Sequence, residues 1–217
     1  MADQPNFYEI NGEKYPRVTH VLKAVSKPGL DRWRGRLGNT EADRVAREGS
    51  SVGNEFHAIV ADINRGIHKT RGWRPDVKYK DMAYAYIDWL HHEIESIQEV
   101  ELTVHSMEYG YAGTMDLLAT FRGDSAPSII DLKTSNSVSS DWPLQLSAYS
   151  RAYNEMTGIV ALKRVIVRVP KKGECIPETY VYEEHDEDDA AWRDLLSFWH
   201  WTEKDKERQK KALQKKK

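Results

Sequence analysis

Apolar residues recur along this chain in two patterns, separated by clusters of glycine, proline and polar residues. Apolar positions three and four residues apart, as in the stripe of Phe56, Ile59, Val60 and Ile63, are typical of one buried face of a helix. Short runs that are alternately or continuously apolar are typical of strands. We predict helices at 17–27, 31–37, 40–48, 52–63, 77–98 and 141–157 and from Asp186 through Trp199, and strands at 100–107, 115–121, 128–133, 161–170 and 176–182.

In chain order these elements are helices, three strands, a helix, two strands and a helix. Strands and helices mixed in this way predict an α/β (α+β) protein, in which a mixed central sheet is flanked by helices. The run from Arg122 to Pro127, rich in glycine, aspartate, serine and proline, separates the second and third strands. We therefore expect these two strands to form a hairpin.

Glycine and proline residues set the expected boundaries in the N-terminal part of the chain. Asn11-Gly12 and Pro16 punctuate residues 1–16, which are expected to form a small hairpin or an irregular arm. The first helix is expected to be capped by Thr19 and to end near Lys27-Pro28-Gly29. A break between helices is expected at Gly49-Ser50-Ser51, because glycine is a poor helix former.

Charge is unevenly distributed along the 217 residues. The formal net charge is −2, but residues 204–217 hold eight Lys/Arg and two Asp/Glu, so this basic C-terminal extension carries +6 and the remainder −8. We expect one domain over residues 1–203, followed by the extension as a solvated helix or a frayed tail. Such an extension attracts nucleic-acid phosphates without sequence preference, or serves solubility alone.

Cysteine content and hydropathy limit the compartment and the cofactors. Cys175 is the single cysteine of the sequence, which excludes a disulfide within the chain and any zinc or iron–sulfur site built from several cysteines. The polar N-terminus does not have the character of a secretory signal, and no apolar run approaches the ~18 residues of a membrane span. We expect an intracellular protein that is not membrane-bound.

Candidate chemistry is concentrated between Tyr109 and Tyr149. Asp116 lies in the apolar run of the second strand, and Asp131 and Lys133 lie two residues apart at the end of the third. Residues two apart on a strand share a face, and the register of the hairpin can bring Asp116 beside Asp131. Two neighbouring carboxylates repel one another unless a cation intervenes, and their oxygens suit Mg²⁺ or Mn²⁺. With a lysine that holds or deprotonates a water or stabilises a phosphorane, the group is equipped to hydrolyse a phosphodiester.

This stretch carries a family resemblance on three spaced motifs, which are Gly113-x-x-Asp116, Asp131-x-Lys133 and Gln145-x-x-x-Tyr149. In this order they resemble the PD-(D/E)XK nuclease superfamily and, within it, the RecB-type exonuclease lineage. They are also similar to phage exonucleases and to mitochondrial genome maintenance exonucleases. Met115 stands where the superfamily has proline, and Asp131 where many members have glutamate. The resemblance covers about residues 57–169 and implies an αβββαβ core, within about residues 50–183, with extra N-terminal helices and a C-terminal helix.

The resemblance also assigns roles to individual residues. It implies the catalytic residues Asp116, Asp131, Lys133, Gln145 and Tyr149. One or two Mg²⁺ or Mn²⁺ ions would be held by the two carboxylates and the Leu132 backbone carbonyl, while Lys133 positions the attacking water. Gln145 is expected to order the lysine or a DNA phosphate, and Tyr149 to support it.

Two residues outside this stretch are further candidate metal ligands. His57 borders a helical apolar stripe, where a histidine is usually a satisfied core or boundary residue. However, Gly53-x-x-x-His57 matches a signature of RecB-type nucleases, which implies that the imidazole is a metal ligand and favours tolerance of Mn²⁺. Glu101 on the first strand is a candidate additional ligand, in competition with Glu99 and Glu108, although a strand glutamate more often faces solvent.

Two segments mix cations with tryptophan, a composition that suits phosphate contact and base stacking. They supply the candidate DNA-binding residues Arg32, Trp33, Arg34, Arg71, Trp73 and Arg74. The alternative for each segment is structural. Trp33 would then be the inward residue of a helix surrounded by solvated arginines, and Trp73 would belong to a surface loop folded back on the core.

The resemblance implies a metal-dependent DNA exonuclease acting on single strands or DNA ends, in phage-type recombination, replication or repair, in a bacterial or phage-infected cytoplasm. The alternatives are a structure-directed or nicking endonuclease and a non-catalytic DNA-binding subunit. DNA is the expected partner, together with a recombination or single-strand-binding protein. Strand polarity and oligomeric state are not determined by the sequence.

Overall fold

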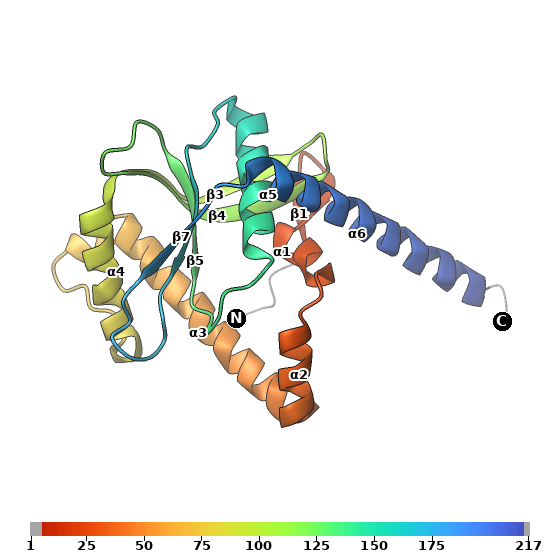
Figure 1. Ribbon diagram of the computed structural model, residues 1–217, viewed down its shortest axis with the longest axis horizontal. Coiled ribbons are helices and arrows are strands. Elements are labelled where there is room, and N and C mark those ends of the chain that lie inside the picture. Colours follow the sequence, from red (N-terminus) through yellow and green to blue (C-terminus); the bar gives the residue numbers. More distant parts are fainter. Residues whose placement is uncertain (1–5, 215–217) are drawn as a thin grey trace.

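A five-stranded sheet forms the centre of the computed structural model, which describes residues 6–214 (Figure 1). In spatial order its strands are β3 (Ile94–Ser106), β4 (Tyr111–Phe121), β5 (Ser128–Lys133), β6 (Arg164–Arg168) and β7 (Glu178–Tyr182). Neighbouring strands are antiparallel except β5 and β6, which run parallel. The mixed central sheet expected from the sequence is therefore confirmed.

Helices cover both faces of this sheet, as Figure 1 shows. α5 (Trp142–Thr157) connects the two parallel strands and packs on one face, together with α1 (Val18–Val21) and the first half of α6 (His185–Gln214). α3 (Asn39–Asn64) and α4 (Lys80–Glu93) pack on the other face. The remaining helical segments are η1 (Leu22–Ala24), α2 (Pro28–Leu37), η2 (Ile67–Lys69) and η3 (Val77–Tyr79).

The central strand β5 is buried between the two helical layers. Ile129 packs in the core on the α5 side, with Leu146, whereas Ile130 packs in the core on the α3 side, with Phe56. Successive strand residues point to opposite faces, so a strand covered on both faces has a continuous apolar run. Asp131 follows directly and is itself buried. The layered fold therefore places a carboxylate in the protein interior.

The first residues that the structure describes form a small hairpin, one of the two alternatives expected for this region. Its strands are β1 (Phe7–Ile10) and β2 (Glu13–Pro16), joined by Asn11 and Gly12. These two residues have φ of 53° and 81°, the positive values that a two-residue type I′ turn requires. The Tyr8 hydroxyl lies 2.6 Å from the Thr114 hydroxyl, which attaches the hairpin to β4.

Helix boundaries in the N-terminal region differ from the predictions. α3 is continuous through Gly49, where a break was expected. Lys171 donates a hydrogen bond to the Gly49 carbonyl oxygen at 3.1 Å, and the second half of the helix is anchored in the core, so packing overrides the low propensity of glycine. Pro28 opens α2 instead of ending a helix, because proline is tolerated at the first helical position. α1 follows Arg17 and is not capped by Thr19.

The boundary between α4 and β3 also differs from the prediction. The helix ends at Glu93, and residues 94–98, which were expected to be helical, begin the strand. Ile94 pairs with Phe121 and Ile97 with Ala119, so this segment lengthens the hairpin with β4. β-Branched residues suit a pleated, half-buried surface, and the cross-strand partners decide the outcome.

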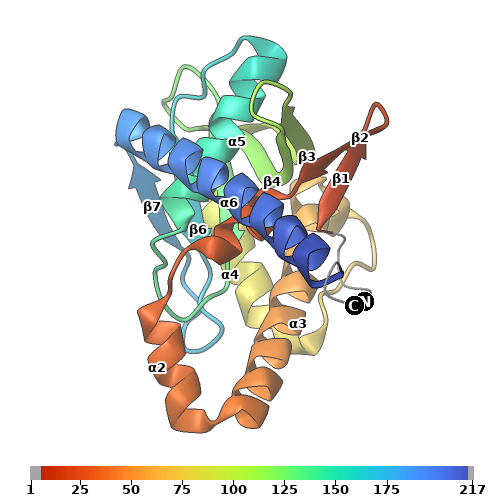
Figure 2. The ribbon, with the colours of Figure 1, turned by 90° about the vertical axis from the view of Figure 1, so that its right-hand side faces the viewer.

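Two helical projections leave the packed layers. The buried residues of α6 lie in its first half, and the C-terminal part of the helix extends away from the body, as Figure 1 shows. The segment expected as a basic extension thus continues α6 through Gln214, while 215–217 lie outside the described residues. α2 has no buried residue and forms an arm with the start of α3 (Figure 2). Over residues 6–214, the helices are each too short or too polar to span a bilayer.

Candidate active site

Asp116 lies on β4 at the point where the pairing with β5 ends. The two strands are paired as far as Leu117 and Ile130. Beyond this pair, Oδ2 of Asp116 accepts a hydrogen bond from the Leu132 N–H at 2.7 Å, so a carboxylate takes the place of a backbone acceptor. The N–H and C=O groups of one strand residue point toward the same neighbouring strand. The Leu132 carbonyl, a predicted metal ligand, is therefore directed to the side of Asp116.

His57 approaches Asp116 from α3, across the layer boundary. Its Nδ1 lies 3.3 Å from Oδ1 of Asp116. Burial lowers the pKa of the imidazole, but attraction to Asp116 and Asp131 outweighs burial, so the pKa is raised. Burial raises the pKa of Asp116, but His57 and Lys133 outweigh it and hold this pKa below its usual range. The pair therefore favours an ionised Asp116 beside a protonated histidine.

Asp131 and Lys133 form a second ion pair, with Nζ of Lys133 2.5 Å from Oδ2 of Asp131. The Asp131 side chain is only 3% exposed, whereas Lys133 is 21% exposed and reaches the surface of the site. Burial, offset in part by Lys133 and reinforced by Asp116, raises the pKa of Asp131 to about 6. Burial lowers the pKa of Lys133, but the two carboxylates outweigh it and raise the pKa. Two buried carboxylates thus share a site that requires positive charge.

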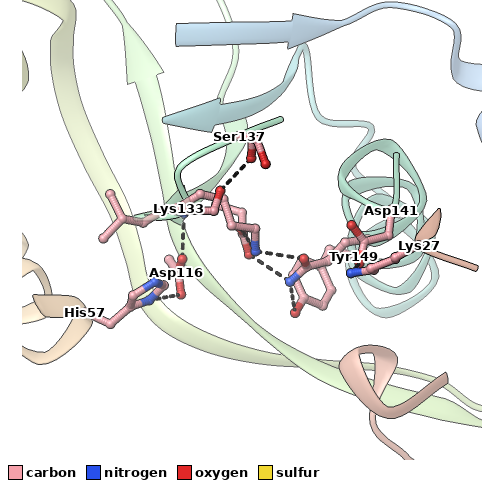
Figure 3. A network of polar contacts seen from close by, with 11 residues as sticks. Lys27, His57, Asp116, Lys133, Ser137, Asp141 and Tyr149 are labelled. Carbon is pink, nitrogen blue, oxygen red and sulfur yellow. Dashed lines mark hydrogen bonds and ion pairs between the residues drawn. The ribbon is translucent and has the colours of Figure 1, made fainter. Parts of the chain in front are cut away.

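Gln145 joins these groups into one hydrogen-bonded network, which Figure 3 shows from close by. Its Oε1 accepts from Lys133 Nζ at 2.8 Å, and its Nε2 donates to Asp131 Oδ1 at 3.0 Å and to the Tyr149 hydroxyl at 2.9 Å. The residues lie on β5 and on the first turns of α5, where positions four apart share a face. Gln145 therefore contacts both Lys133 and Tyr149, while its role in ordering the lysine stays a prediction.

The donor set fits a magnesium or manganese ion that is bound in part by water and substrate. Among the described residues, no three His, Cys, Asp or Glu side chains form a metal-binding group. Mg²⁺, however, usually binds through one or two carboxylates and keeps several waters or substrate phosphates. Asp116, Asp131 and the Leu132 carbonyl are oxygen donors of that kind, and His57 lies beside them.

The two motif glycines have different physical roles. A Cβ on Gly113 would lie 2.5 Å from Cε1 of Tyr149 and 3.2 Å from Val18, so this position requires glycine for α5 to approach β4. A Cβ on Gly53 would meet Thr134 Oγ1 at 3.5 Å, an ordinary contact. Gly113 therefore sets the distance at which Tyr149 and Gln145 reach the carboxylates, whereas Gly53 does not limit the approach of α3.

Glu101 on β3 lies opposite Asp116 on β4, since the flanking pairs are Val100 with Leu117 and Leu102 with Met115. Its φ is 58°, a left-handed value that is strained for glutamate. Burial and then repulsion from Asp116 raise the pKa of its carboxyl group. Glu101 is therefore electrostatically coupled to the site, and its role as an additional ligand stays a prediction.

The predicted DNA-binding segments are not part of this network. Trp33 is half-buried on α2, next to Arg34, which pairs with Asp43. Trp73 packs against the core on the α3 side, which agrees with the structural alternative for this loop. Arg32, Arg71 and Arg74 are exposed. None of these residues has a hydrogen bond or ion pair with the network in the part of the chain that the structure describes.

The structure adds polar residues that the sequence analysis did not select. Arg168 donates to the Ser135 carbonyl oxygen at 3.1 Å and so holds the loop between β5 and α5. Lys27, which precedes α2, lies 2.6 Å from Oδ2 of Asp141 at the start of α5. The serine-rich composition of residues 135–140 indicated a loop between β5 and α5. Lys27 and Asp141, however, are 114 positions apart, and no local sequence pattern links them.

Comparisons with known proteins were made at the level of sequence and of structure. No protein-family model matches the sequence, and no curated protein matches it. The fold is similar to the crystal structure of a putative exonuclease from Eubacterium rectale, with a TM-score of 0.44 and 12% identity over 65% of this chain and 62% of that one. It is also similar to the crystal structure of SSO0001, with a TM-score of 0.43 and 15% identity over 85% and 82% of the two chains. This chain thus spans less than two thirds of the length of the first structure.

Proposed function

We propose that this protein is a metal-dependent DNA nuclease that hydrolyses phosphodiester bonds, as an exonuclease on single strands or DNA ends. The observation that carries the proposal is the network in which Gln145 holds Lys133 and Asp131 together beside Asp116. Two carboxylates that can hold a metal ion and a lysine that lines a cleft suit metal-assisted phosphodiester hydrolysis. The exonuclease mode is supported by the order of the RecB-type motifs.

Asp116, Asp131 and the Leu132 carbonyl would hold Mg²⁺ or Mn²⁺, with His57 as an additional nitrogen donor. When bound, the ion supplies a water of lowered pKa and neutralises charge on the phosphate. In its absence, His57 and Lys133 balance the two carboxylates. To act as a ligand, the His57 imidazole would have to lose its proton, and it would then be a nitrogen donor of the type that Mn²⁺ accepts.

The side chains of the network orient the reaction before the substrate arrives. The Lys133 ammonium donates hydrogen bonds to the attacking water or to the phosphoryl oxygens, where negative charge develops. Gln145 fixes the direction of this ammonium through Oε1 and the direction of Asp131 through Nε2. Tyr149 fixes Gln145 in turn. Preorganisation of this kind reduces the entropy lost in reaching the transition state.

A gel assay with purified protein tests this proposal. Linear single-stranded DNA, labelled at one end or the other, is incubated with Mg²⁺ or Mn²⁺ beside a covalently closed circle. Wild-type protein is expected to degrade the linear DNA alone, and the two labels give the direction. Lys133→Ala and Asp131→Asn are expected to lose activity, since each removes a member of the reacting group.

Lys163→Ala is the matched control for the lysine variant. Lys163 also pairs with an aspartate, Asp124, but at the opposite end of the sheet, at the start of β6. This variant is expected to keep wild-type activity. Full activity in Lys133→Ala and Asp131→Asn would overturn the proposed site. Cleavage of the circle would indicate an endonuclease, and DNA binding without cleavage would indicate a non-catalytic subunit.

A further inference from the structure

A cleft of about 790 Å³ opens beside Lys133. One wall is the segment from α1 to the start of α2, and the other is the loop that leads from β5 into α5. Lys133 and Gln145 of the catalytic network lie in its lining. The cleft is therefore continuous with the candidate active site, and a ligand in it would lie beside the reacting phosphate.

The lining of this cleft favours an anion. The cations that line it are Lys23, Lys27 and Lys133, against the single carboxylate of Asp141. The loop wall adds serine hydroxyl groups, among them Ser137, which can donate to phosphate oxygens. Lysine and serine are common donors to the phosphates and sugars of nucleic acids. A polyanionic ligand is therefore the best electrostatic match.

The loop wall is fixed in place by its own contacts. Arg168 of β6 donates to the Ser135 carbonyl oxygen at 3.1 Å, and the Ser135 hydroxyl donates to the Ser137 carbonyl oxygen at 2.8 Å. At the far end of the loop, Asp141 precedes α5 but does not cap it with its side chain. Its carboxylate instead faces Lys27 at 2.6 Å (Figure 3). This ion pair joins the two walls across the cleft.

Apolar side chains complete the lining. Leu30 and Val138, from opposite walls, both line the cleft and are about half exposed. These aliphatic side chains offer apolar contact to the bases of an unpaired strand, and the neighbouring lysines offer charge to its backbone. A volume of this size is within the range of pockets that hold small organic ligands, so the cleft has room for a few nucleotides of one strand.

We propose that this cleft binds single-stranded DNA next to the scissile phosphate, with Lys27 transferring from Asp141 to a backbone phosphate. The proposal rests on the proposed nuclease function and deepens it by naming the cleft and the ion pair that hold the single strand. Asp141 holds Lys27 in position without DNA and competes with the phosphate for its charge. The two members of one ion pair are therefore expected to have opposite effects on affinity.

Fluorescence anisotropy in EDTA measures this binding without cleavage. The probe is an end-labelled oligo(dT) of about ten nucleotides, compared with a duplex of equal length. Lys27→Ala is expected to weaken binding of the single strand about tenfold and to reduce the salt dependence by about one phosphate contact. Asp141→Asn is expected to tighten binding severalfold, since it removes the competing carboxylate. Binding of the duplex is expected to be weaker and insensitive to both changes.

Lys163→Ala is again the matched control. The ion pair of Lys163 with Asp124 has the same 2.6 Å distance as that of Lys27 with Asp141. The two lysine side chains are 36% and 37% exposed, and the two aspartate side chains are 17% and 14% exposed. Wild-type affinity is expected in this variant. Lys23→Ala serves as a second cleft variant should Lys27→Ala not fold, and it is also expected to weaken binding.

If Lys27→Ala and Asp141→Asn change the affinity for the single strand in the same direction, the proposal is overturned. Loss of either partner of a purely structural ion pair would change the affinity in the same way. Equal sensitivity of the duplex would overturn the assignment to a single strand. The assay separates this proposal from the nuclease itself. If the cleft variants change binding but the protein does not cleave DNA, only the proposed nuclease activity is overturned. If the protein cleaves DNA and the cleft variants change neither binding nor cleavage, only the proposed role of the cleft is overturned.

Discussion

The candidate site and the two helical projections are built in opposite ways. In the site, the side chain of Gln145 has three hydrogen-bond partners, and one of them, Asp131, is almost completely buried. In the projections, α2 buries no residue and the second half of α6 is exposed to solvent. A side chain held by several buried partners is restricted to one rotamer, whereas an exposed side chain samples many rotamers. Substitutions should therefore have large effects in the first region and small effects in the second.

The largest expected effect is on catalysis, in Gln145→Leu. This change removes the groups that direct Lys133 and Asp131, and a displacement of about 1 Å in a reacting group costs about 100-fold in rate. We expect kcat to fall by about that factor in a single-turnover cleavage assay. Tyr149→Phe is the matched control, because it leaves both of the other Gln145 hydrogen bonds in place and is expected to lose less. A rate within threefold of wild type in Gln145→Leu would contradict the positioning role.

The next largest effect is on stability, and it separates the two motif glycines. Gly113→Ala places a methyl group 2.5 Å from the Tyr149 ring, and overpacking of this kind costs about 1–3 kcal/mol. Gly53→Ala places one in ordinary contact within α3, where alanine is favoured over glycine by up to about 1 kcal/mol. Urea unfolding should show a loss for the first and no loss for the second. A stable Gly113→Ala would mean that α5 can move away from β4 without penalty.

The difference between the glycines also bears on what the sequence could reveal. Asp116, Asp131, Lys133 and Gln145 come together because one hairpin and one strand–helix connection join them, and such local links can be read from strand spacing and turn composition. The role of Gly113 could not be read in this way. It depends on the distance between α5 and β4, which no spacing encodes.

Contacts between distant segments account for the rest of what the sequence did not predict. Lys27 meets Asp141 across 114 positions, and Lys171 supports Gly49 across 122. The first contact joins the two walls of the cleft, and the second stabilises α3 where a break was expected. His57 reached the candidate list through the family resemblance, since its neighbourhood alone favoured a structural histidine. Placing such residues requires the tertiary fold.

A smaller effect is expected at Glu101, where strain and charge can be separated. Glu101→Gly relieves the positive φ and should raise the free energy of unfolding by about 1 kcal/mol. Glu101→Gln keeps the strain and removes the charge, so its stability should stay near that of wild type. A fall in Mn²⁺-dependent cleavage in both variants would support a role of the carboxylate at the metal. If Glu101→Gly is not more stable than Glu101→Gln, the backbone at this position is not strained.

The smallest effect is expected for removal of the projecting part of α6. Residues 204–214 contribute no buried side chain, so a chain that stops after Glu203 should have a free energy of unfolding within about 0.5 kcal/mol of wild type. Trp199→Ala, in the packed half of the same helix, is the control and should cost about 3–5 kcal/mol, because it empties a buried aromatic site. Thermal unfolding of the wild type, the truncated chain and Trp199→Ala measures the loss of stability in each variant. A large loss in the truncated chain would place the projection in the folding unit, whereas the expected result leaves its basic charge free to act on binding alone.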